Sequence, residues 1–509
     1  MSCSQTKYEL LQEHSNLRDN YNWLRLCIFA AICISSSIAV YFTWSVIYQQ
    51  SLNIPPKFTD IPIRYYNRAE IYSEKFYKSK PYSRDKSKFF KKLDFVSKNK
   101  TQEVKQIENE RIYPSKYGNY IYKQDTGLKL VCYYEASASS KLINTLYLNN
   151  VDPHLCTHLN VGIVQIAENR LIIDDRMKRS LEETKLLKKK NKDLKVLLWV
   201  GGGTTSNFSE MVAQSSNRKI FIQSLVSVLE IYCLDGIDLD WEFPNSRKSE
   251  RLHFSQLLHE IRREYQRDHR TYLLTVAVAA PERLIFSAYD VEAINSYTDF
   301  VNVMTFDYHF YTKNSPLTGF NAPLYADISE HKMLHNLNIN YTVNIWLSEG
   351  LDKRKAVIGL PTYGHSFKLV NPFNNGIGAP AEDFGRVGTY GFASYSEVCW
   401  FRQRNLYVTT IYDAETCSPY LYAGTEWISY EDERSLECKA QYIKANGFGG
   451  AMIFSLNTDD YGSHCNLNLT ENSNDKNSTF PLVRKIYSQL RQSRRLYLIT
   501  ITRHLMSAR

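Results

Sequence analysis

Leu234-Asp-Gly-Ile-Asp-Leu-Asp-Trp-Glu-Phe-Pro244 carries acidic residues at three alternate positions. If the segment is a β-strand, Asp238, Asp240 and Glu242 point to one face, and the apolar residues between them point to the other. The apolar face must pack against helices, so the acids face the inside of the structure. In a closed barrel of parallel strands that face is the interior, and the carboxyl end of the strand opens onto the functional site.

The acidic row has a chemical consequence. Three carboxylates stacked about 6.5–7 Å apart cannot all ionise cheaply, so one should keep a proton at neutral pH, as a general acid must. Glu242 is last in the row and nearest the barrel rim, and we expect it to be that acid. A solvated surface strand could carry the same alternation, and Asp-x-Asp-x-Glu could bind a divalent metal. Because no histidine is clustered nearby, we predict no metal site.

Short apolar or β-branched segments alternate with amphipathic stretches along the rest of the chain. A helical pattern lies between several of them, as in residues 250–268, ERLHFSQLLHEIRREYQRD. Eight strands that alternate with helices predict an α/β fold, a TIM (β/α)8 barrel. The predicted strands are Leu128–Tyr134, His158–Ile166, Leu194–Val200, Gly236–Asp240, Tyr272–Val278, Phe300–Phe306, Ala356–Leu360 and Gly450–Ser455.

Composition and charge exclude several classes of protein. Of the 509 residues, 43% are apolar and 23% are charged, which excludes a wholly disordered chain and a simple coiled coil. The net charge of +9 is concentrated between Lys57 and Lys100, where 13 basic residues outnumber 5 acidic ones. A nucleic-acid-binding domain would carry its surplus on a folded face, so we expect no nucleic-acid partner. We predict that residues 49–126 form a basic Tyr/Lys-rich stalk, solvated or in contact with anionic lipid or glycans, and that residues 494–509 form a basic tail.

Leu26–Tyr48 runs for 23 positions without a charge. As a helix it would extend about 34 Å, enough to cross the hydrocarbon core of a bilayer. The alternatives are a buried core helix and a cleavable signal peptide, for which the run is too long. Seven of the ten cysteines and five N-glycosylation sequons follow the run, which favours an oxidising compartment. We expect a type II signal anchor, with residues 1–25 in the cytosol and the remainder extracellular or lumenal. The sequons are at Asn99, Asn207, Asn340, Asn468 and Asn477.

The acidic strand resembles the Asp-x-x-Asp-x-Asp-x-Glu signature of family 18 glycoside hydrolases, the chitinases and their lectin-like relatives. Other segments match family motifs in the same order, over about residues 127–493. The resemblance implies a TIM barrel with a small α+β insertion at about residues 365–426. The matching segments are Leu130-Val-Cys-Tyr-Tyr134, Cys156-Thr-His-Leu159, Leu198-Trp-Val-Gly-Gly202, Met304-Thr-Phe-Asp307, Gly359-Leu-Pro-Thr-Tyr-Gly364, Gly449-Gly-Ala-Met452 and Phe480-Pro-Leu-Val483.

The resemblance implies hydrolysis of β-1,4-linked N-acetylglucosamine glycans by substrate-assisted retaining catalysis, without a cofactor. Glu242 would protonate the leaving oxygen, and the substrate's own acetamido oxygen would be the nucleophile. Asp240 would orient the acetamido group, and Asp238 would hold Asp240 in position. Asp307 and Tyr363 would contact the sugar near the bond that is cleaved.

Four residues depart from the family pattern, one of them His365, which stands where an arginine is common. Phe306 replaces a tyrosine whose hydroxyl would grip the acetamido oxygen, and loss of one such donor costs on the order of 10²–10³ in rate. Phe454 replaces the tryptophan that would form the floor beneath the reacting sugar. Trp199 replaces a small residue and would either intrude on this floor or compensate for Phe454. Met304, in the same motif as Phe306, and Trp427, either a sugar platform or a packing residue, complete the expected substrate-binding set.

Two functions of different class follow from this comparison. The first is a chitinase-type hydrolase, slow because of Phe306 and Phe454. The second is a chitin-binding, lectin-like protein without useful turnover. Such relatives usually lose the glutamate, whereas Glu242 is retained here, and this favours hydrolysis. A structural barrel without a sugar ligand is the third alternative. N-acetylglucosamine oligosaccharides are the expected partners of the first two.

Six of the seven cysteines after the predicted anchor are expected in disulfides. The resemblance implies one bridge between the first two strands and another between the insertion and the chain after the eighth strand. The remaining two cysteines are left as a hypothetical third pair. Cys233 is the odd one, and we expect it to be a buried free thiol. The three pairs are Cys132–Cys156, Cys399–Cys465 and the hypothetical Cys417–Cys438.

Overall fold

The computed structural model of the protein describes residues 127–136, 146–203, 207–245, 249–327, 335–465 and 479–491. All of them belong to one unit of the chain, Pro62–Arg509. The predicted anchor, stalk and C-terminal tail lie outside the described residues, as do the sequons at Asn99, Asn468 and Asn477. Within the described ranges, no helix is both long enough and apolar enough to cross a membrane.

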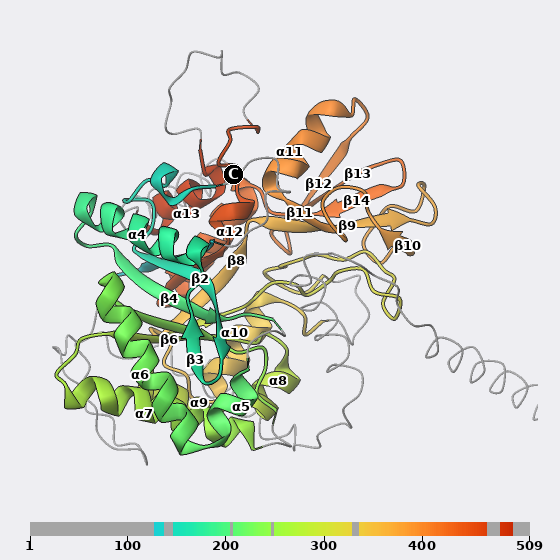
Figure 1. Ribbon diagram of the computed structural model, residues 1–509. Helices are drawn as coiled ribbons and strands as arrows, with labels where there is room; N and C mark the ends of the chain where they lie inside the picture. Colours follow the sequence, from blue (N-terminus) through green and yellow to red (C-terminus); the bar gives the residue numbers. More distant parts are fainter. Residues whose placement is uncertain are drawn as a thin grey trace, which may run out of the picture. The chain divides into compact units, whose positions relative to one another are not determined.

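Eight parallel strands close into a barrel, which confirms the predicted fold class (Figure 1). The ring is closed by β1, which pairs in parallel with both β2 and β15. Val131 of β1 aligns with His158 on one side and with Met452 on the other. The barrel strands are β1 (Lys129–Glu135), β2 (His158–Ala167), β4 (Lys195–Gly201), β5 (Gly236–Asp240), β6 (Leu273–Val278), β7 (Phe300–Val303), β8 (Ala356–Pro361) and β15 (Gly450–Phe454). The short β3 (Arg170–Ile172) forms an antiparallel hairpin with β2.

Strand β7 ends earlier than the sequence pattern indicated. It stops at Val303 and not at Phe306, because the backbone N–H of Thr305 turns back to the carbonyl oxygen of Val303, 2.9 Å away. Two residues later, Asp307 has a left-handed backbone with a φ of 60°. The chain therefore leaves the strand sharply, and Asp307 lies beyond the carboxyl end of β7.

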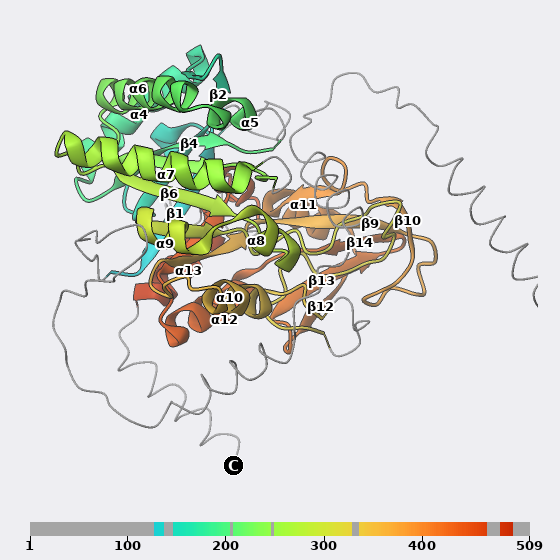
Figure 2. The same cartoon turned by 90° about the horizontal axis from the view of Figure 1, so that it is seen from below.

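Helices cover the outside of the barrel (Figure 2). The predicted amphipathic segment forms α7 (Glu250–Arg267), whose apolar face includes the buried residues Phe254, Leu257 and Ile261. This face packs toward α9 and β6, so the helix covers the barrel beside the acidic strand. The remaining helices of the barrel are α4 (Asp175–Lys190), α5 (Phe208–Ala213), α6 (Ser215–Tyr232), α8 (Glu282–Ala288), α9 (Val291–Tyr297), α10 (Ile339–Ser348), α12 (Glu433–Asn446) and α13 (Pro481–Arg491), with 3-10 turns η1 (Leu148–Asn150) and η3 (Leu456–Thr458).

A second, antiparallel sheet follows β8 and lies beside the barrel in both views (Figure 1, Figure 2). Its strands run from Tyr363 to Ser429. The sequence predicted the insertion at about residues 365–426, so its bounds differ from the observed ones by only a few residues. The sheet has a core of its own, which includes Phe367 and Leu369. Its elements are β9 (Tyr363–Leu369), β10 (Ala381–Phe384), β11 (Phe392–Ser394), α11 (Tyr395–Arg404), β12 (Thr409–Asp413), β13 (Ser418–Ala423) and β14 (Glu426–Ser429).

Trp427 belongs to the core of this second sheet, so of the two alternatives for this residue the structure shows packing and not a platform for a sugar. Its side chain is fully buried. The indole N–H donates to the carbonyl oxygen of Asn375 over 3.0 Å, and the ring stacks on Tyr420 with centroids 5.1 Å apart. Phe367 meets the same ring edge-on at 5.4 Å. The indole is thus used for packing within the sheet.

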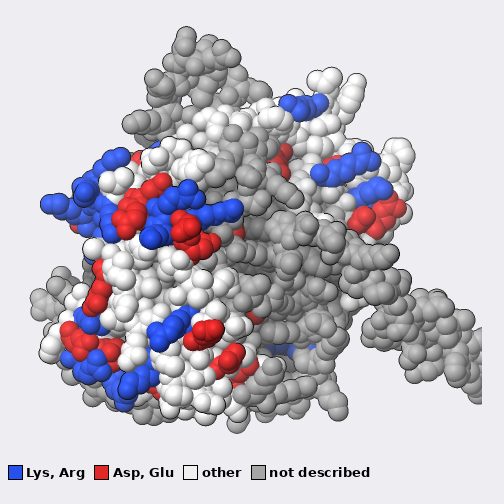
Figure 3. Space-filling model, in the orientation of Figure 1, with Lys and Arg blue, Asp and Glu red and all other residues white. Residues whose placement is uncertain are grey.

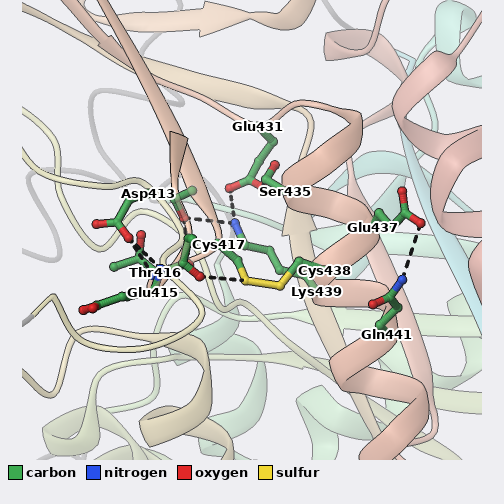
Figure 4. Close-up of a disulfide and its surroundings, with 12 residues drawn as sticks. Asp413, Glu415, Thr416, Cys417, Glu431, Ser435, Glu437, Cys438, Lys439 and Gln441 are labelled. Carbon is green, nitrogen blue, oxygen red and sulfur yellow. Dashed lines mark hydrogen bonds and ion pairs between the residues drawn. A yellow bond between two sulfur atoms is a disulfide. The ribbon is translucent and has the colours of Figure 1, made fainter. Parts of the chain in front are cut away.

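The three expected disulfides are all formed, and each joins two different elements of the chain. One links β1 to the segment before β2, and one links α11 to the chain after β15. The third links the residue before β13 to α12, with Cα atoms 6.2 Å apart (Figure 4). The pairs are Cys132–Cys156, Cys399–Cys465 and Cys417–Cys438.

A buried ion pair between Glu431 and Lys439 lies beside the third disulfide (Figure 4). Both side chains are 1% exposed. The hydroxyl of Ser435 donates to the Glu431 carboxylate over 2.6 Å, and the Lys439 ammonium also donates to the Ser418 hydroxyl over 3.3 Å. Burial raises the pKa of Glu431 and lowers the pKa of Lys439, and in each case the charge of the partner opposes the shift. The pair therefore depends on mutual compensation of two buried charges.

Cys233 is exposed, so the prediction of a buried free thiol is wrong. The residue follows α6 and ends that helix in a left-handed conformation, with a φ of 55°. Its carbonyl oxygen accepts a hydrogen bond of 2.9 Å from the Lys188 ammonium group. The backbone is thus fixed at the end of the helix, while the side chain is left at the surface.

The surface of α4 carries mixed charge. In Figure 3, Lys and Arg side chains gather on the face that includes this helix, with acidic side chains between them. The helix begins with Asp175 and ends with Lys188, Lys189 and Lys190, the order that the helix dipole favours. Such interspersed charge is typical of a solvated helix face.

Candidate functional site

The acidic row lies at the end of β5, where the sequence predicted it. Asp238 and Asp240 are part of the strand, and Glu242 follows two residues later. Their exposed fractions are 0%, 1% and 6% in that order, so exposure increases toward the carboxyl end of the strand. Ile237 and Leu239, which alternate with the acids, are fully buried on the other face.

Asp238 is held by side chains from three other barrel strands, which places it in the barrel interior. Its Oδ2 accepts the hydroxyl of Tyr133 over 2.5 Å. Its Oδ1 accepts the hydroxyl of Thr275 over 2.5 Å and the amide of Asn302 over 2.9 Å. Burial raises the pKa of the Asp238 carboxyl, and the hydrogen bonds from these donors oppose the rise. The carboxyl group is thus fixed in place from β1, β6 and β7.

Asp240 accepts a hydrogen bond from the indole of Trp199, with 3.0 Å between Nε1 and Oδ2. Trp199 lies in β4 and is aligned with Asp238 of the neighbouring β5. Its side chain is buried. The large residue at this position therefore reaches the middle carboxylate of the acidic row.

Phe454 lies among four other aromatic rings at the end of β15. Its ring centroid is 5.6 Å from that of Tyr133, 5.7 Å from Trp199, 5.6 Å from Phe306 and 6.3 Å from Tyr363. The contact with Trp199 is edge-to-face, a favoured geometry for aromatic pairs. Trp199 therefore packs directly against the phenyl ring at position 454.

Phe306 and Met304 are buried in the same region of the barrel. Phe306 also packs edge-to-face on Tyr363, with centroids 6.1 Å apart. Gly359 makes room for the phenyl ring, because a β-carbon at that position would lie 2.9 Å from it. Position 306 therefore offers a hydrocarbon surface without a hydroxyl donor.

Asp307, Tyr363 and His365 form a second polar group. The Tyr363 hydroxyl donates to Oδ1 of Asp307 over 2.6 Å, and Nε2 of His365 lies 2.8 Å from the same oxygen. The backbone N–H of Asp307 donates to the side-chain oxygen of Asn321 over 2.9 Å, which fixes the turn after β7. Because Tyr363 and His365 belong to β9, this group joins the barrel to the second sheet.

The donors around Asp238 were missed by the sequence reasoning. Tyr133, Thr275 and Asn302 are buried, and each lies within a strand that the sequence predicted. A usable signal exists for Thr275 and Asn302, because each is a polar residue that interrupts an apolar strand. The signal could not say which carboxylate they contact, because that depends on closure of the barrel.

No group of three or more His, Cys, Asp or Glu side chains that could hold a metal ion occurs in the described part of the chain. Two of the predicted glycosylation sites can be placed. Asn207 is exposed immediately before α5, and Asn340 is half-buried in α10. The side-chain oxygen of Asn340 accepts the hydroxyl of Tyr442 over 2.9 Å.

A row of carboxylates at the open end of a (β/α)8 barrel, with aromatic rings around it, defines the class of glycosidase-type barrels. The family model of glycosyl hydrolases family 18 matches residues 129–459. The chain belongs to this family.

Similar proteins include both chitinases and chitinase-like proteins. Chitotriosidase-1 of Mus musculus is 34% identical over 379 residues, which are 71% of this chain and 78% of the relative. Chitinase-3-like protein 2 of Homo sapiens is 35% identical over 352 residues, 66% of this chain and 89% of the relative. A solved structure of human YKL-39, described as a pseudo-chitinase with retained chitooligosaccharide binding properties, has a TM-score of 0.66 at 33% identity. The match covers 72% of this chain and 100% of that one.

Proposed function

We propose that the barrel binds N-acetylglucosamine oligosaccharides at the carboxyl end of its strands without efficient turnover. The observation that carries the proposal is the hydrogen bond from Trp199 to Asp240, in a site where position 306 is a phenylalanine. The class of ligand is supported by the family and by the chitooligosaccharide binding ascribed to YKL-39.

Groups suited to holding a sugar lie around Asp307. The side chains of Asp307 and His365 are 9% and 10% exposed, so both keep some surface for a ligand. The ring of Phe310 lies 5.7 Å from that of His365, and Phe392 stacks on Tyr363 at 4.3 Å. Polar groups that converge beside aromatic rings are typical of small-molecule sites, because the rings take apolar faces and the polar groups fix orientation.

Efficient substrate-assisted hydrolysis would require three groups to act together. These are an acid for the leaving oxygen, a carboxylate that accepts the acetamido N–H, and a donor that holds the acetamido oxygen. Glu242 supplies the first. Asp240 is the candidate for the second, and its Oδ2 is already bonded to Trp199. Phe306 cannot supply the third, and loss of such a donor costs on the order of 10²–10³ in rate.

Chitinase-type hydrolysis is the second candidate function. It is favoured by the retention of Glu242 at the open end of the acidic row, where it is 6% exposed. In this case Glu242 would act as the general acid, Asp240 would orient the acetamido group, and Asp238 would hold Asp240.

One experiment separates the two candidates. Residues 127–509 would be produced in a secretory host and tested for fluorophore release from N-acetylchitooligosaccharides, with Glu242→Gln as the control and chitin pull-down in parallel. We expect retention on chitin and no turnover above the control. Turnover that disappears in Glu242→Gln would establish the hydrolase instead, and absence of both retention and turnover would contradict both functions.

We also propose that residues 26–48 anchor the chain in a membrane with the barrel on the oxidising side. Three disulfides in the barrel unit support this location, because such bonds persist in oxidising compartments. In sealed microsomes that contain the full chain, the barrel should resist added protease, and a glycosidase that removes N-glycans should reduce its mass. Digestion of the barrel in intact vesicles would refute this topology.

A further inference from the structure

We propose that Trp199 is a built-in ligand of Asp240, whose indole N–H occupies the carboxylate oxygen that an acetamido N–H of a sugar would use, and that it thereby restrains turnover. Trp199 is a positioning residue in this scheme, because it acts through Asp240. The inference rests on the proposed function and deepens it, since it names the residue that separates binding from hydrolysis in this chain.

The indole N–H is a chemical match for the group it replaces. Indole and acetamide each present one neutral N–H, and the 3.0 Å between Nε1 of Trp199 and Oδ2 of Asp240 is an ordinary N–H···O length. A hydrogen bond to a charged group contributes about tenfold to a hundredfold to an equilibrium constant. An acetamido N–H that uses the same oxygen must share it with the indole N–H, so the sugar gains less from Asp240 than it would without Trp199.

The indole is fixed in this position by its surroundings. Tyr133 and Phe454 meet it edge-to-face, with ring centroids at 4.9 Å and 5.7 Å. Gly162 of β2 makes room for it, because a β-carbon there would lie 2.8 Å from Cε3 of the indole. The absence of a side chain at Gly162 and the smaller ring at position 454 both accommodate tryptophan at position 199.

Asp238, the acid next to Asp240 in the row, is also bonded to a donor that contacts Trp199. Tyr133 packs against the indole with its ring and donates its hydroxyl to Asp238. Asp238 and Asp240 are therefore both bonded to donors that the protein itself supplies, and the two donors touch each other. Glu242 lies outside this arrangement at the exposed end of the row.

The test uses the full chain and two replacements of Trp199. Trp199→Phe removes the N–H and keeps an aromatic ring, and benzothienylalanine at the same position keeps the bicyclic shape without the N–H. Trp346→Phe is the matched control, because this buried indole also donates an N–H, to the carbonyl oxygen of Ala279 over 3.1 Å, away from the acidic row. Each replacement is made in the wild-type chain and in Phe306→Tyr. Four quantities are measured for each protein. They are the initial rate on a fluorogenic N-acetylchitooligosaccharide, the half-saturating concentration, the retention on chitin and the thermal midpoint of unfolding.

We expect both replacements of Trp199 to raise the saturated rate by about tenfold or more, with a change of less than about threefold in half-saturating concentration. The acetamido N–H gains positive charge only as the bond breaks, so the freed oxygen of Asp240 stabilises the transition state more than the bound sugar. The gain should disappear when Glu242→Gln is added, and Trp346→Phe should show no gain. Variants that still bind chitin but hydrolyse no faster in either background would overturn the inference and leave the proposed binding function intact. Failure of every protein to bind the oligosaccharide or chitin would overturn the proposed function, and the inference with it.

Discussion

Tyr133 and Asp238 are 105 residues apart in the sequence, and the tyrosine hydroxyl donates to the aspartate carboxylate over 2.5 Å inside the barrel. The same hydroxyl accepts the amide of Asn302 over 3.1 Å, so one side chain connects β1, β5 and β7. Burial raises the pKa of Tyr133 well above its usual value, and the charge of Asp238 adds to the rise. The phenol therefore stays protonated and remains a donor.

Replacing Tyr133 by Phe should lower the free energy of unfolding by about 1.5–3 kcal/mol, because a buried carboxyl loses one of its donors. Tyr134→Phe is the matched control: that hydroxyl donates to the neutral carbonyl oxygen of Leu146 over 3.0 Å, and its loss should cost about 1 kcal/mol. Denaturant unfolding of residues 127–509 measures both. Equal losses in the two variants would mean that the contact with Asp238 contributes no more than an ordinary hydrogen bond.

The buried pair of Glu431 and Lys439 gives a second prediction. Lys439→Met should lower the free energy of unfolding by about 3–5 kcal/mol, because it leaves the Glu431 carboxylate buried without its counter-charge. The double variant Glu431→Gln/Lys439→Met should lose less than the two single variants together, because it removes both charges. Denaturant unfolding of the wild type, the two single variants and the double variant completes this double-mutant cycle. If the losses in free energy of unfolding were simply additive, the two charges would not depend on each other.

Asp459 gives a prediction of pH dependence. Burial raises its pKa from 3.8 to about 7, although the backbone N–H groups of Asp460 and Val483 donate to its carboxyl over 2.7 Å and 3.0 Å. The folded protein thus holds this proton more tightly than the unfolded chain. The resulting stability is fully present below about pH 3.8 and is lost as the pH rises through about 7.

The variant Asp459→Asn isolates this effect. Between about pH 5 and pH 8, the free energy of unfolding of the wild type should fall more than that of the variant, since only the wild type loses the proton. Asparagine keeps one side-chain oxygen as an acceptor, so the variant should still fold. Parallel curves for the two proteins would show that Asp459 does not titrate in this range.

The exposed thiol of Cys233 gives a prediction about reactivity. Iodoacetamide should add to the folded, unreduced fragment 127–509 at this residue, because the other six cysteines of the fragment are in disulfides. Cys233→Ser should show no adduct, and its free energy of unfolding should change by less than about 0.5 kcal/mol, as for other surface substitutions. Intact mass measurement counts the adducts on each fragment. A wild-type fragment without an adduct would contradict the exposure of the thiol.

Features that depend on local periodicity could be predicted from the sequence. The alternation of acids in β5 and the eight apolar segments needed only the period of a strand and the turn signals around it. The interior position of Asp238 followed from the same alternation. The motifs of the family then located Asp307 and Tyr363, which the structure joins by a hydrogen bond.

Features that depend on tertiary contacts could not be predicted. Thr275 and Asn302 reach Asp238 only because the closed barrel brings β6 and β7 beside β5. Trp427 is buried because the second sheet builds a core of its own, which no local pattern reveals. Cys233 is exposed because α6 ends in a left-handed residue there, a detail that hydropathy does not encode.

Closure of the barrel between β1 and β15 sets an order on maturation during synthesis. Cys132 and Cys156 both precede β2 in the sequence, whereas Cys465 follows all eight barrel strands. Until β15 emerges, β1 and β8 each present an open edge, which is a template for aggregation. A premature stop before Gly450 would therefore give a chain that contains Cys132, Cys156 and the acidic row but cannot complete the ring that shields them.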